Sequence, residues 1–208
     1  MRTTRRLVSL VCLLIASILL GGCAPAPPRH QANICHIFYK YPQWYWAAQK
    51  TRKRWGVPVS VQMAIIHEES HFRADAKPAR TKLLGFIPWF RPSTAEGYAQ
   101  AVNSTWKHYL QQTGRNRASR ASFDAASDFI GWFAYRAHVR AGISRDNAYA
   151  LYLAYHQGIL GYQERSYQNK PWLLRIAHNV QLMANHYRAQ LLSCADKIPK
   201  HHWWNFFS

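Results

Sequence analysis

The fold of this chain is decided by residues 64–72, which read AIIHEESHF. Pro58 lies shortly before this stretch, at a position typical of the first turn of a helix, and we expect the helix to continue to about Phe72. At 100° per residue, Glu68 and Glu69 flank its apolar stripe on opposite sides. Only one of these two carboxylates can therefore enter a given cleft.

The pentapeptide HEESH inside this stretch matches H-E-x-x-H, in which two histidines on one helix face bind zinc. In that interpretation His67 and His71 are the metal ligands, and Glu68 is the general base of a zinc metalloprotease. Such a site needs a third protein ligand. Lys77 stands where one known extension has its third histidine, and Glu96 lacks the flanking sequence of a glutamate ligand. A helix with two incidental surface histidines is the simpler alternative.

Two more blocks follow in the sequence, GYAQ at residues 97–100 and AYHQG at residues 154–158. Together with AIIHEESHF they resemble, in the same order, the three motifs of the soluble-lytic-transglycosylase (SLT) family. That family carries Ala-Ile-Ile followed by Gln-Glu-Ser-x-Phe, then Gly-Tyr-Ala-Gln or Gly-Leu-Met-Gln, and then Ala-Tyr-Asn-x-Gly. The resemblance extends from about Trp55 to Cys194. It implies a mainly α fold, a goose-type lysozyme-like helical domain, and a lytic transglycosylase that cleaves peptidoglycan.

The resemblance places Glu69 at the position of the family's catalytic acid and Glu68 at the position of a glutamine. It implies that Glu69 first protonates the oxygen that joins N-acetylmuramic acid to N-acetylglucosamine. The carboxylate then removes the proton of the muramic acid 6-hydroxyl, and ring closure gives a 1,6-anhydro product. Burial is expected to raise the pKa of Glu69, so that this side chain holds its proton near neutrality.

Acidic residues are scarce, because the chain has only nine of them and none is spaced as an obvious partner of Glu69. This scarcity disfavours an ordinary glycosidase, which uses two carboxyl groups. Asp75 or Glu96 could still fold back into the cleft, so hydrolysis to a reducing end remains an alternative.

Residues of the three motifs are the candidates for binding the sugar or orienting the acid: Ser70, Tyr98, Gln100, Tyr155, His156 and Gly158. Tyr155 is expected to donate a hydrogen bond to the acid, as the family tyrosine is thought to do. His156 replaces the family's asparagine. We expect it to be neutral or turned toward the saccharide, because an imidazolium would favour the carboxylate form of Glu69. A purely structural role is the alternative for Ser70, Gln100 and Tyr155.

Proline, serine and glycine signals divide the rest of the chain into further helices. Pro42 and Gly56 bound one helix, and Ser122 and Gly142 bound another. Further helices are expected at residues 103–112, 146–157 and 171–192. No run alternates apolar and polar residues for long enough to require a strand. The architecture is therefore predicted to be mainly helical.

Residues 73–92 interrupt this pattern, with three prolines around an apolar centre. The segment is too rich in proline for a helix and too apolar for an ordinary loop. It is either a lid or cleft wall, or a loop packed over the core. Trp89 and Phe90 within it are the aromatic side chains that we expect to stack on sugar rings.

The N-terminus has the pattern of a secretory signal, since Arg2, Arg5 and Arg6 precede an apolar run at residues 7–20. That run is short for a membrane span. The sequence LGGC, which ends at Cys23, resembles the lipobox of bacterial lipoproteins and implies that Cys23 is lipidated. Alanine rather than aspartate follows the cysteine, which favours the periplasmic side of the outer membrane over the inner membrane. An ordinary signal or a short anchor helix is the alternative.

The chain is strongly basic, with 27 Lys and Arg against nine Asp and Glu and a net charge of +18. Removal of residues 1–22 takes away three arginines and no acid, which leaves 186 residues with a net charge of +15. Such a surface attracts anions, which outside the inner membrane are wall carboxylates and lipid head groups. No nucleic-acid module is visible. The expected partners are therefore peptidoglycan and, through the lipid anchor, a membrane.

Of the remaining cysteines, Cys12 leaves with the signal, and Cys35 and Cys194 lie near the two ends of the folded region. In an oxidising periplasm such a pair is a candidate disulfide, and two free thiols are the alternative.

The expected organisation is a lipoprotein signal peptide at residues 1–22, a proline-rich extended tether at 23–32, an SLT domain at 33–194 and an aromatic and basic tail at 195–208. The tail either docks on the domain or rests at a membrane interface. We expect no cofactor and no metal. A non-catalytic lipoprotein that binds the wall through its basic surface is the third functional alternative.

Overall fold

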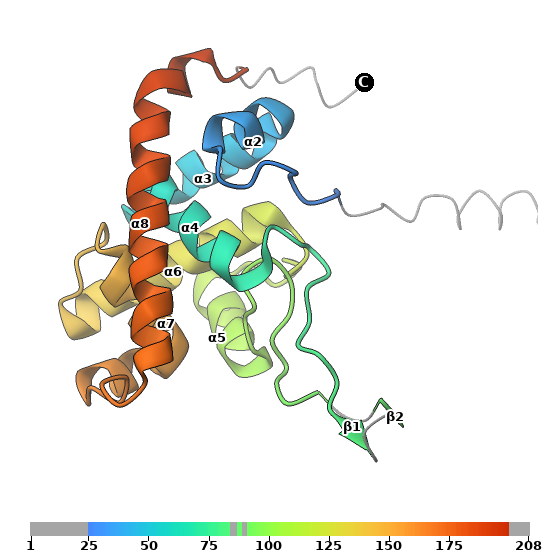
Figure 1. Ribbon diagram of the computed structural model, residues 1–208, viewed down its shortest axis with the longest axis vertical. Helices are drawn as coiled ribbons and strands as arrows, with labels where there is room; N and C mark the ends of the chain where they lie inside the picture. Colours follow the sequence, from blue (N-terminus) through green and yellow to red (C-terminus); the bar gives the residue numbers. More distant parts are fainter. Residues whose placement is uncertain (1–24, 84–86, 89–90, 200–208) are drawn as a thin grey trace, which may run out of the picture.

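A computed structural model describes residues 25–83, 87–88 and 91–199 of the chain (Figure 1). Within these residues the backbone forms seven α-helices, two short strands and one 3-10 helix. Their bounds are α2 Ile34–Lys40, α3 Pro42–Trp55, α4 Val59–Ser70, β1 Lys82–Leu83, β2 Ile87–Pro88, α5 Asn103–Thr113, α6 Phe123–Ala141, α7 Ala148–Gln163, α8 Pro171–Cys194 and η1 Ala195–Lys197. The fold is mainly helical, as the sequence predicts.

The helix ends coincide with capping residues that can be read in the sequence. The side chain of Ser122 accepts a hydrogen bond from the backbone amide of Ala125 at the start of α6. Such a bond satisfies one of the amides that have no partner within the helix. Pro42 opens α3, and Gly56 ends it in the left-handed conformation. The predicted bounds of α3 and α6 are therefore confirmed.

Two helices differ from the sequence prediction. The helix expected at residues 146–157 begins at Ala148, because the side chain of Asn147 caps it, and it runs on to Gln163 across a kink at Gly158. The short helix α2 lies outside the predicted helices. Its seven residues are too few to show a clear periodic pattern of apolar side chains.

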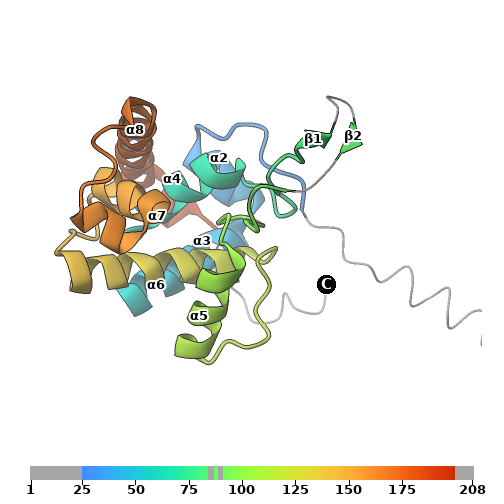
Figure 2. The ribbon, with the colours of Figure 1, turned by 90° about the horizontal axis from the view of Figure 1, so that it is seen from below.

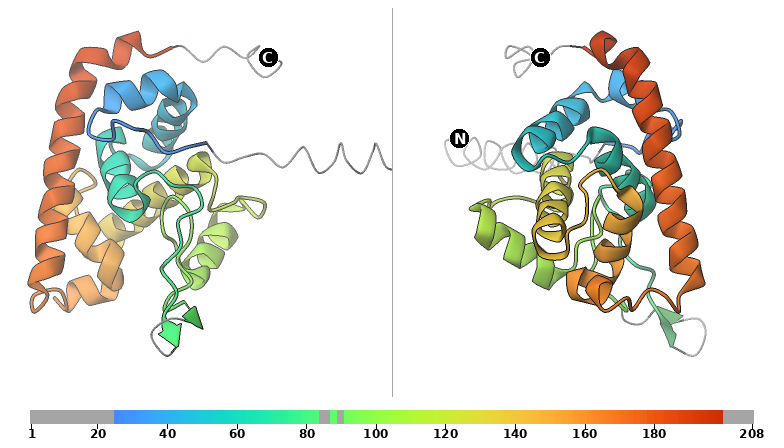
Figure 3. Two further views of the ribbon diagram at one scale, coloured as in Figure 1. Left: turned by 45° about the vertical axis from the view of Figure 1, so that its right-hand side comes forward. Right: turned by 90° about the vertical axis from the view of Figure 1, so that its left-hand side faces the viewer.

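The central helix is α4, which packs against α8, α3, α6 and α7. The long helix α8 runs along one side of the molecule and covers α4 and α7 (Figures 1 and 3). All residues of α4 from Val59 to Ile66 are buried, so this helix is enclosed on every side until its last turn. The buried Gln62 side chain donates to the carbonyls of Ala48 and Val57 and accepts a hydrogen bond from Ser127. These bonds fix the register of α4 against α3 and α6.

Strands β1 and β2 form an antiparallel hairpin, with Leu83 opposite Ile87. The hairpin projects away from the helices in each of the views (Figures 1, 2 and 3). Of the two interpretations of residues 73–92, a loop packed over the core is therefore wrong for the hairpin. Trp89 and Phe90, which we expect to stack on sugar rings, lie outside the described residues.

Helix α2 is joined to the end of α8. A disulfide links Cys35 of α2 to Cys194 of α8, with 6.0 Å between their Cα atoms and a sequence separation of 159. Among the described residues, no helix has the length and apolar character needed to cross a membrane.

The segment expected to be an extended tether packs on the domain over its described part, residues 25–32. Pro28 is buried, the Tyr41 hydroxyl donates to the carbonyl of Ala26, and the Gln31 amide donates to the carbonyl of His71. Residues 25–32 are thus held against the domain, because a carbonyl and an amide of this segment form hydrogen bonds and the apolar ring of Pro28 is buried. The tail also docks over its first residues, since Ile198 is buried and the Trp46 indole donates to the carbonyl of Pro199.

Candidate active site

Glu69 lies in the last turn of α4, where this helix emerges from the core. The chain turns sharply there, because His71 and Phe72 both have a positive φ, 50° and 60°. This conformation is uncommon for residues other than glycine and is typically found at functional sites. Phe72 is fully buried and holds the turn against the core. The sequence AIIHEESHF thus forms a buried helix that presents one carboxyl group at its end.

The environment of Glu69 favours its neutral form. Burial raises the pKa of Glu69 to about 8; a hydrogen bond from Tyr152 acts in the opposite direction, and the charge of Glu68 adds to the increase. The residue as a whole is partly accessible, whereas its carboxyl group lies among protein atoms, which is the main cause of the raised pKa. Among the described residues no ion pair involves Glu69, although the chain is rich in cations. Glu69 therefore holds a proton near neutral pH.

Tyr152 on α7 is the hydroxyl that lowers the pKa of Glu69, from a position beside its carboxyl group. Its side chain is only 5% exposed, and burial together with the charge of Glu69 raises its pKa far above the usual range. The motif comparison does not include Tyr152. The sequence feature that could have identified Tyr152 is its spacing of three residues from Tyr155. This spacing places both tyrosines on the same face of one helix.

Tyr155 makes a different contact from the one expected. Its hydroxyl donates a short hydrogen bond to the carbonyl of Ala99. Because a hydroxyl has one proton, this bond leaves none for Glu69. Tyr155 is nevertheless close to the acid, since its pKa is raised by burial and then by the charge of Glu69. Tyr155 thus connects the acid to the loop that contains GYAQ.

The GYAQ loop is held by backbone geometry. Gly97 has φ +77°, and a Cβ atom there would collide with the carbonyl of Arg120. The Gln100 side-chain amide donates to the carbonyls of Ala76 and Gly97, each at 2.9 Å. These bonds tie the loop to the chain that leaves α4. Gln100 therefore shapes the site, and its described bonds are to the backbone.

Tyr98 and Ser70 make structural contacts in this structure. The ring of Tyr98 is 1% exposed and packs edge-on against Trp44 and Phe123. Burial raises the pKa of Tyr98 to about 12, and its hydroxyl has no hydrogen-bond partner among the described residues. The buried Ser70 hydroxyl donates to the carbonyl of Ile66, one turn earlier in α4. Neither side chain reaches the acid through a described hydrogen bond.

A pocket of about 280 Å³ brings four candidate residues together. Gln100, Tyr155, His156 and Gly158 line it, over a floor that includes Phe129 and Phe133. Glu69 is not part of this lining. Tyr155 belongs to the pocket wall, and the charge of Glu69 raises the pKa of Tyr155. The site thus consists of the end of α4, the GYAQ loop and the kinked part of α7.

Gly158 produces the kink in α7. Its φ of 77° and ψ of 159° lie in a region that only glycine occupies readily. The backbone conformation therefore explains the glycine of the Ala-Tyr-x-x-Gly pattern, because a side chain at position 158 would strain the turn beside the pocket.

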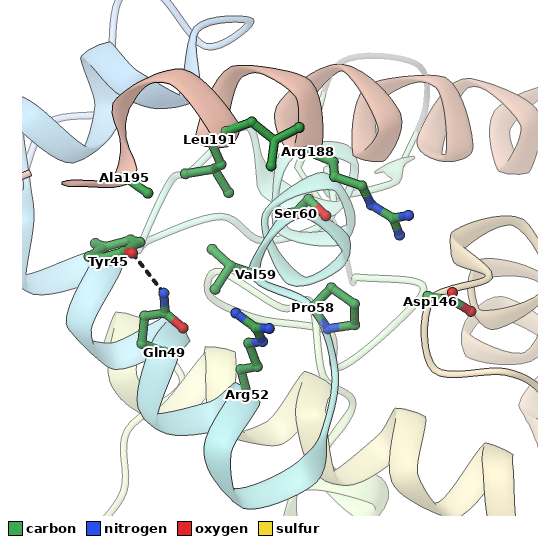
Figure 4. A pocket seen from close by; sticks show the side chains of 11 residues that line it. Tyr45, Gln49, Arg52, Pro58, Val59, Ser60, Asp146, Arg188, Leu191 and Ala195 are labelled. Atoms are coloured by element: carbon green, nitrogen blue, oxygen red, sulfur yellow. Dashed lines mark hydrogen bonds between the residues drawn. The ribbon is translucent and has the colours of Figure 1, made fainter. Parts of the chain in front are cut away.

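A larger pocket of about 460 Å³ lies elsewhere, between α3, the start of α4 and the end of α8 (Figure 4). Its lining includes Arg52, Val59 and Arg188 but none of the candidate residues. Ten residues of α4 separate Val59 from Glu69, about 15 Å at the rise of an α-helix. This pocket is therefore distinct from the candidate active site.

The HEESH pentapeptide does not have the geometry of a zinc site. His71 lies just past the end of α4 in the left-handed conformation. His67 and His71 therefore do not lie on successive turns of one helix. Their ring centroids are 5.0 Å apart. Burial lowers the pKa of His67, and the charge of the neighbouring His71 lowers it further. Among the described residues, no group of three His, Cys, Asp or Glu side chains is arranged to hold a metal ion.

The fold and the site together define a lysozyme-like helical domain with a single buried acid at the end of its central helix. The family model described as the transglycosylase SLT domain matches residues 11–194, and the chain belongs to this family. Membership implies a lytic transglycosylase whose substrate is peptidoglycan. Neither a curated protein nor a solved structure matches the chain.

Proposed function

We propose that this protein cleaves the bond between N-acetylmuramic acid and N-acetylglucosamine in peptidoglycan, with Glu69 as general acid and then general base. The observation that carries the proposal is the raised pKa of Glu69, about 8, at the end of a buried helix. A carboxyl group in such a place is protonated at neutral pH and can donate to a leaving oxygen.

In the first step the proton of Glu69 passes to the glycosidic oxygen. The bond from the muramic acid C1 to that oxygen breaks, N-acetylglucosamine leaves as an alcohol, and C1 becomes oxocarbenium-like. Glu69 is now a carboxylate, and the neighbouring hydroxyl of Tyr152, which lowers the pKa of Glu69, can donate a hydrogen bond to the new charge. The tyrosine thus favours the charged form of Glu69 at the moment when it is produced.

In the second step the 6-hydroxyl of the same muramic acid attacks C1. Its proton passes to the carboxylate of Glu69, which restores the acid, and the 1,6-anhydro ring closes. No water is consumed, and no second carboxylate is required. This agrees with the described ion pairs of Glu96, which bind Lys77 and Arg120 and leave that carboxylate occupied.

The neighbouring glutamates provide the test of this assignment. We expect Glu69→Gln to abolish digestion of purified sacculi and Glu68→Gln to retain most of it. A zinc protease would lose activity with Glu68→Gln and with a chelator, whereas EDTA should leave this enzyme unaffected. Sacculus binding without digestion by the wild-type protein would instead favour the non-catalytic wall-binding alternative.

We also propose that residues 1–22 are a lipoprotein signal peptide and that Cys23 anchors the protein to the periplasmic side of the outer membrane. Support comes from the basic and apolar N-terminal sequence and from the LGGC stretch at residues 20–23. Metabolic labelling with palmitate should mark the wild-type protein and leave a Cys23→Ser variant unlabelled. Recovery of the labelled protein with inner-membrane vesicles would contradict the outer-membrane assignment.

A further inference from the structure

Four polar side chains between the end of α7 and the start of α8 are linked by hydrogen bonds, and two of them line the pocket. Lys170 Nζ lies 2.6 Å from Gln157 Oε1, and the Ser166 hydroxyl lies 3.0 Å from the same oxygen and 3.0 Å from the carbonyl of Gly161. Gln157 Nε2 lies 2.8 Å from Nδ1 of His156. His156 in turn packs against the ring of Trp172, with 5.1 Å between the centroids.

The chemistry of these groups fixes the orientation of the glutamine amide. A lysine ammonium is only a donor, so the atom 2.6 Å from it must be the amide oxygen. The NH₂ of Gln157 therefore faces His156. An amide NH₂ is also only a donor, so Nδ1 of His156 must accept and has no proton of its own. The proton of a neutral imidazole then lies on Nε2.

We propose that Lys170 and Gln157 are positioning residues that hold His156 as a neutral imidazole with its proton on Nε2, so that it donates a hydrogen bond to the saccharide. This deepens the proposed function and rests on it for the identity of the ligand. In the family motif this place belongs to an asparagine, whose amide can donate in the same way. The acceptor is an oxygen of the sugar, such as the carbonyl of an N-acetyl group.

The surroundings of His156 support this state. Nδ1 and Nε2 lie on opposite sides of the ring, so Nε2 is turned away from Gln157. His156 lines the pocket beside Tyr155, and among the described residues Nε2 has no hydrogen-bond partner. Burial and then the charge of Lys170 lower the pKa of His156. No described carboxylate forms an ion pair with His156 that would favour the imidazolium.

The test is the protonation state of the imidazole, read by two-bond ¹H–¹⁵N NMR of the full chain labelled in its histidines. The His156→Asn variant identifies the signals of His156 among those of the 11 histidines. We expect Nε2 to be protonated and Nδ1 unprotonated at pH 7. Protonation of Nδ1 at pH 7, either alone or together with Nε2, would overturn the proposal. This readout is independent of whether the protein cleaves peptidoglycan.

Two variants test the positioning residues. Gln157→Glu replaces the donor at Nδ1 by an acceptor and should bring a proton to Nδ1. It should also reduce the rate of sacculus digestion by about three- to tenfold, which corresponds to one hydrogen bond. Lys170→Met should move the titration midpoint of His156 to higher pH. An unchanged titration in Lys170→Met would contradict a role for this lysine.

The pair formed by Gln190 and His186, where the amide also lies 2.7 Å from a ring nitrogen, offers a control for the added charge. Gln190→Glu adds the same charge beside a histidine that is exposed, as His156 is, but lies on α8 outside the pocket. Because Gln190 also accepts from the Ile34 amide and donates to the Ala32 carbonyl, digestion is measured at a temperature where the variant is folded. We expect full digestion by this variant. If Gln190→Glu slowed digestion as much as Gln157→Glu, the effect would come from the added charge and the proposal would fail.

Discussion

The hydroxyl of Tyr152 on α7 lies beside the carboxyl group of Glu69 on α4 and acts on the pKa of Glu69 as a hydrogen-bond donor does. This contact lowers the pKa of Glu69, whereas burial raises it by a larger amount, and the balance is a pKa of about 8. In the proposed reaction both effects have a role. Burial would keep the proton on Glu69 before the reaction, and the tyrosine would stabilise the carboxylate after the proton has left.

The variant Tyr152→Phe tests the hydrogen bond. In the proposed mechanism only protonated Glu69 acts as the acid, so the activity of the wild type should decline as the pH rises through about 8. Loss of the Tyr152 bond should raise the pKa of Glu69 and move this decline to higher pH. The maximal rate should fall by about tenfold, because the carboxylate formed in the reaction loses a donor.

The control for this variant is Tyr45→Phe. The Tyr45 hydroxyl accepts a hydrogen bond from Gln49 in the larger pocket, away from Glu69 (Figure 4). A pH–rate curve for Tyr152→Phe that coincides with the curves of the wild type and Tyr45→Phe would contradict the role given to Tyr152.

The raised pKa of Glu69 also predicts an effect on stability. Between about pH 4.5 and 8 the unfolded chain releases this proton while the native protein retains it, so ionisation favours unfolding as the pH rises. Glu69→Gln removes this cost. The variant should therefore be more stable than the wild type at pH 7, by about 1–3 kcal/mol in urea unfolding. The two proteins should become similar near pH 4, and a variant less stable than the wild type at both pH values would argue against a buried, neutral Glu69.

Gly158→Ala tests the kink in α7. The backbone conformation at Gly158, φ 77° and ψ 159°, should make the variant less stable by about 1–3 kcal/mol. Gly114→Ala is a suitable comparison, because its φ of 70° and ψ of 9° are left-handed helical and its added methyl group meets open space. Urea unfolding of the two variants gives the measurement. Equal losses would show that the conformation at Gly158 imposes no special requirement.

The disulfide should contribute to stability and leave the chemistry unchanged. Cys35→Ser should lower the free energy of unfolding by about 2–5 kcal/mol, because the bond closes a very long loop. Activity at a temperature where the variant remains folded should match that of the wild type, since the bond joins α2 to the end of α8. Urea unfolding with and without reductant measures the first effect, and a proportional loss of activity in the folded variant would place the disulfide in the active site.

Much of the fold can be predicted from the sequence, because helix ends depend on local chemistry. Pro42 and Gly56 bound α3 as expected, and Ser122 begins the cap of α6. The acid in the last turn of α4 follows from the pattern of AIIHEESHF. The packing of residues 25–32 was not predictable in this way, since it depends on carbonyl groups that any residue carries and on contacts with distant side chains such as Tyr41 and Tyr187.

In the candidate site, too, local sequence predicts the elements but not the contacts between distant side chains. The motifs identify α4, the GYAQ loop and the end of α7 as the elements of the site, and the pocket beside Tyr155 joins the last two. They do not show which tyrosine bonds to the acid, because Tyr152 and Tyr155 lie on the same helix face and only the packing of α7 on α4 distinguishes them. The network around His156 was equally hidden, since Lys170 and Gln157 are 13 residues apart.

The mass of the fragments released from purified sacculi tests the central claim most directly. If Glu69 is the only carboxylate that acts and the muramic acid 6-hydroxyl is the nucleophile, the released muropeptides will be 1,6-anhydro forms. These are lighter by one water than the products of hydrolysis, and Glu69→Gln should release none. Muropeptides with a reducing end from the wild type, or undiminished release by Glu69→Gln, would contradict the account.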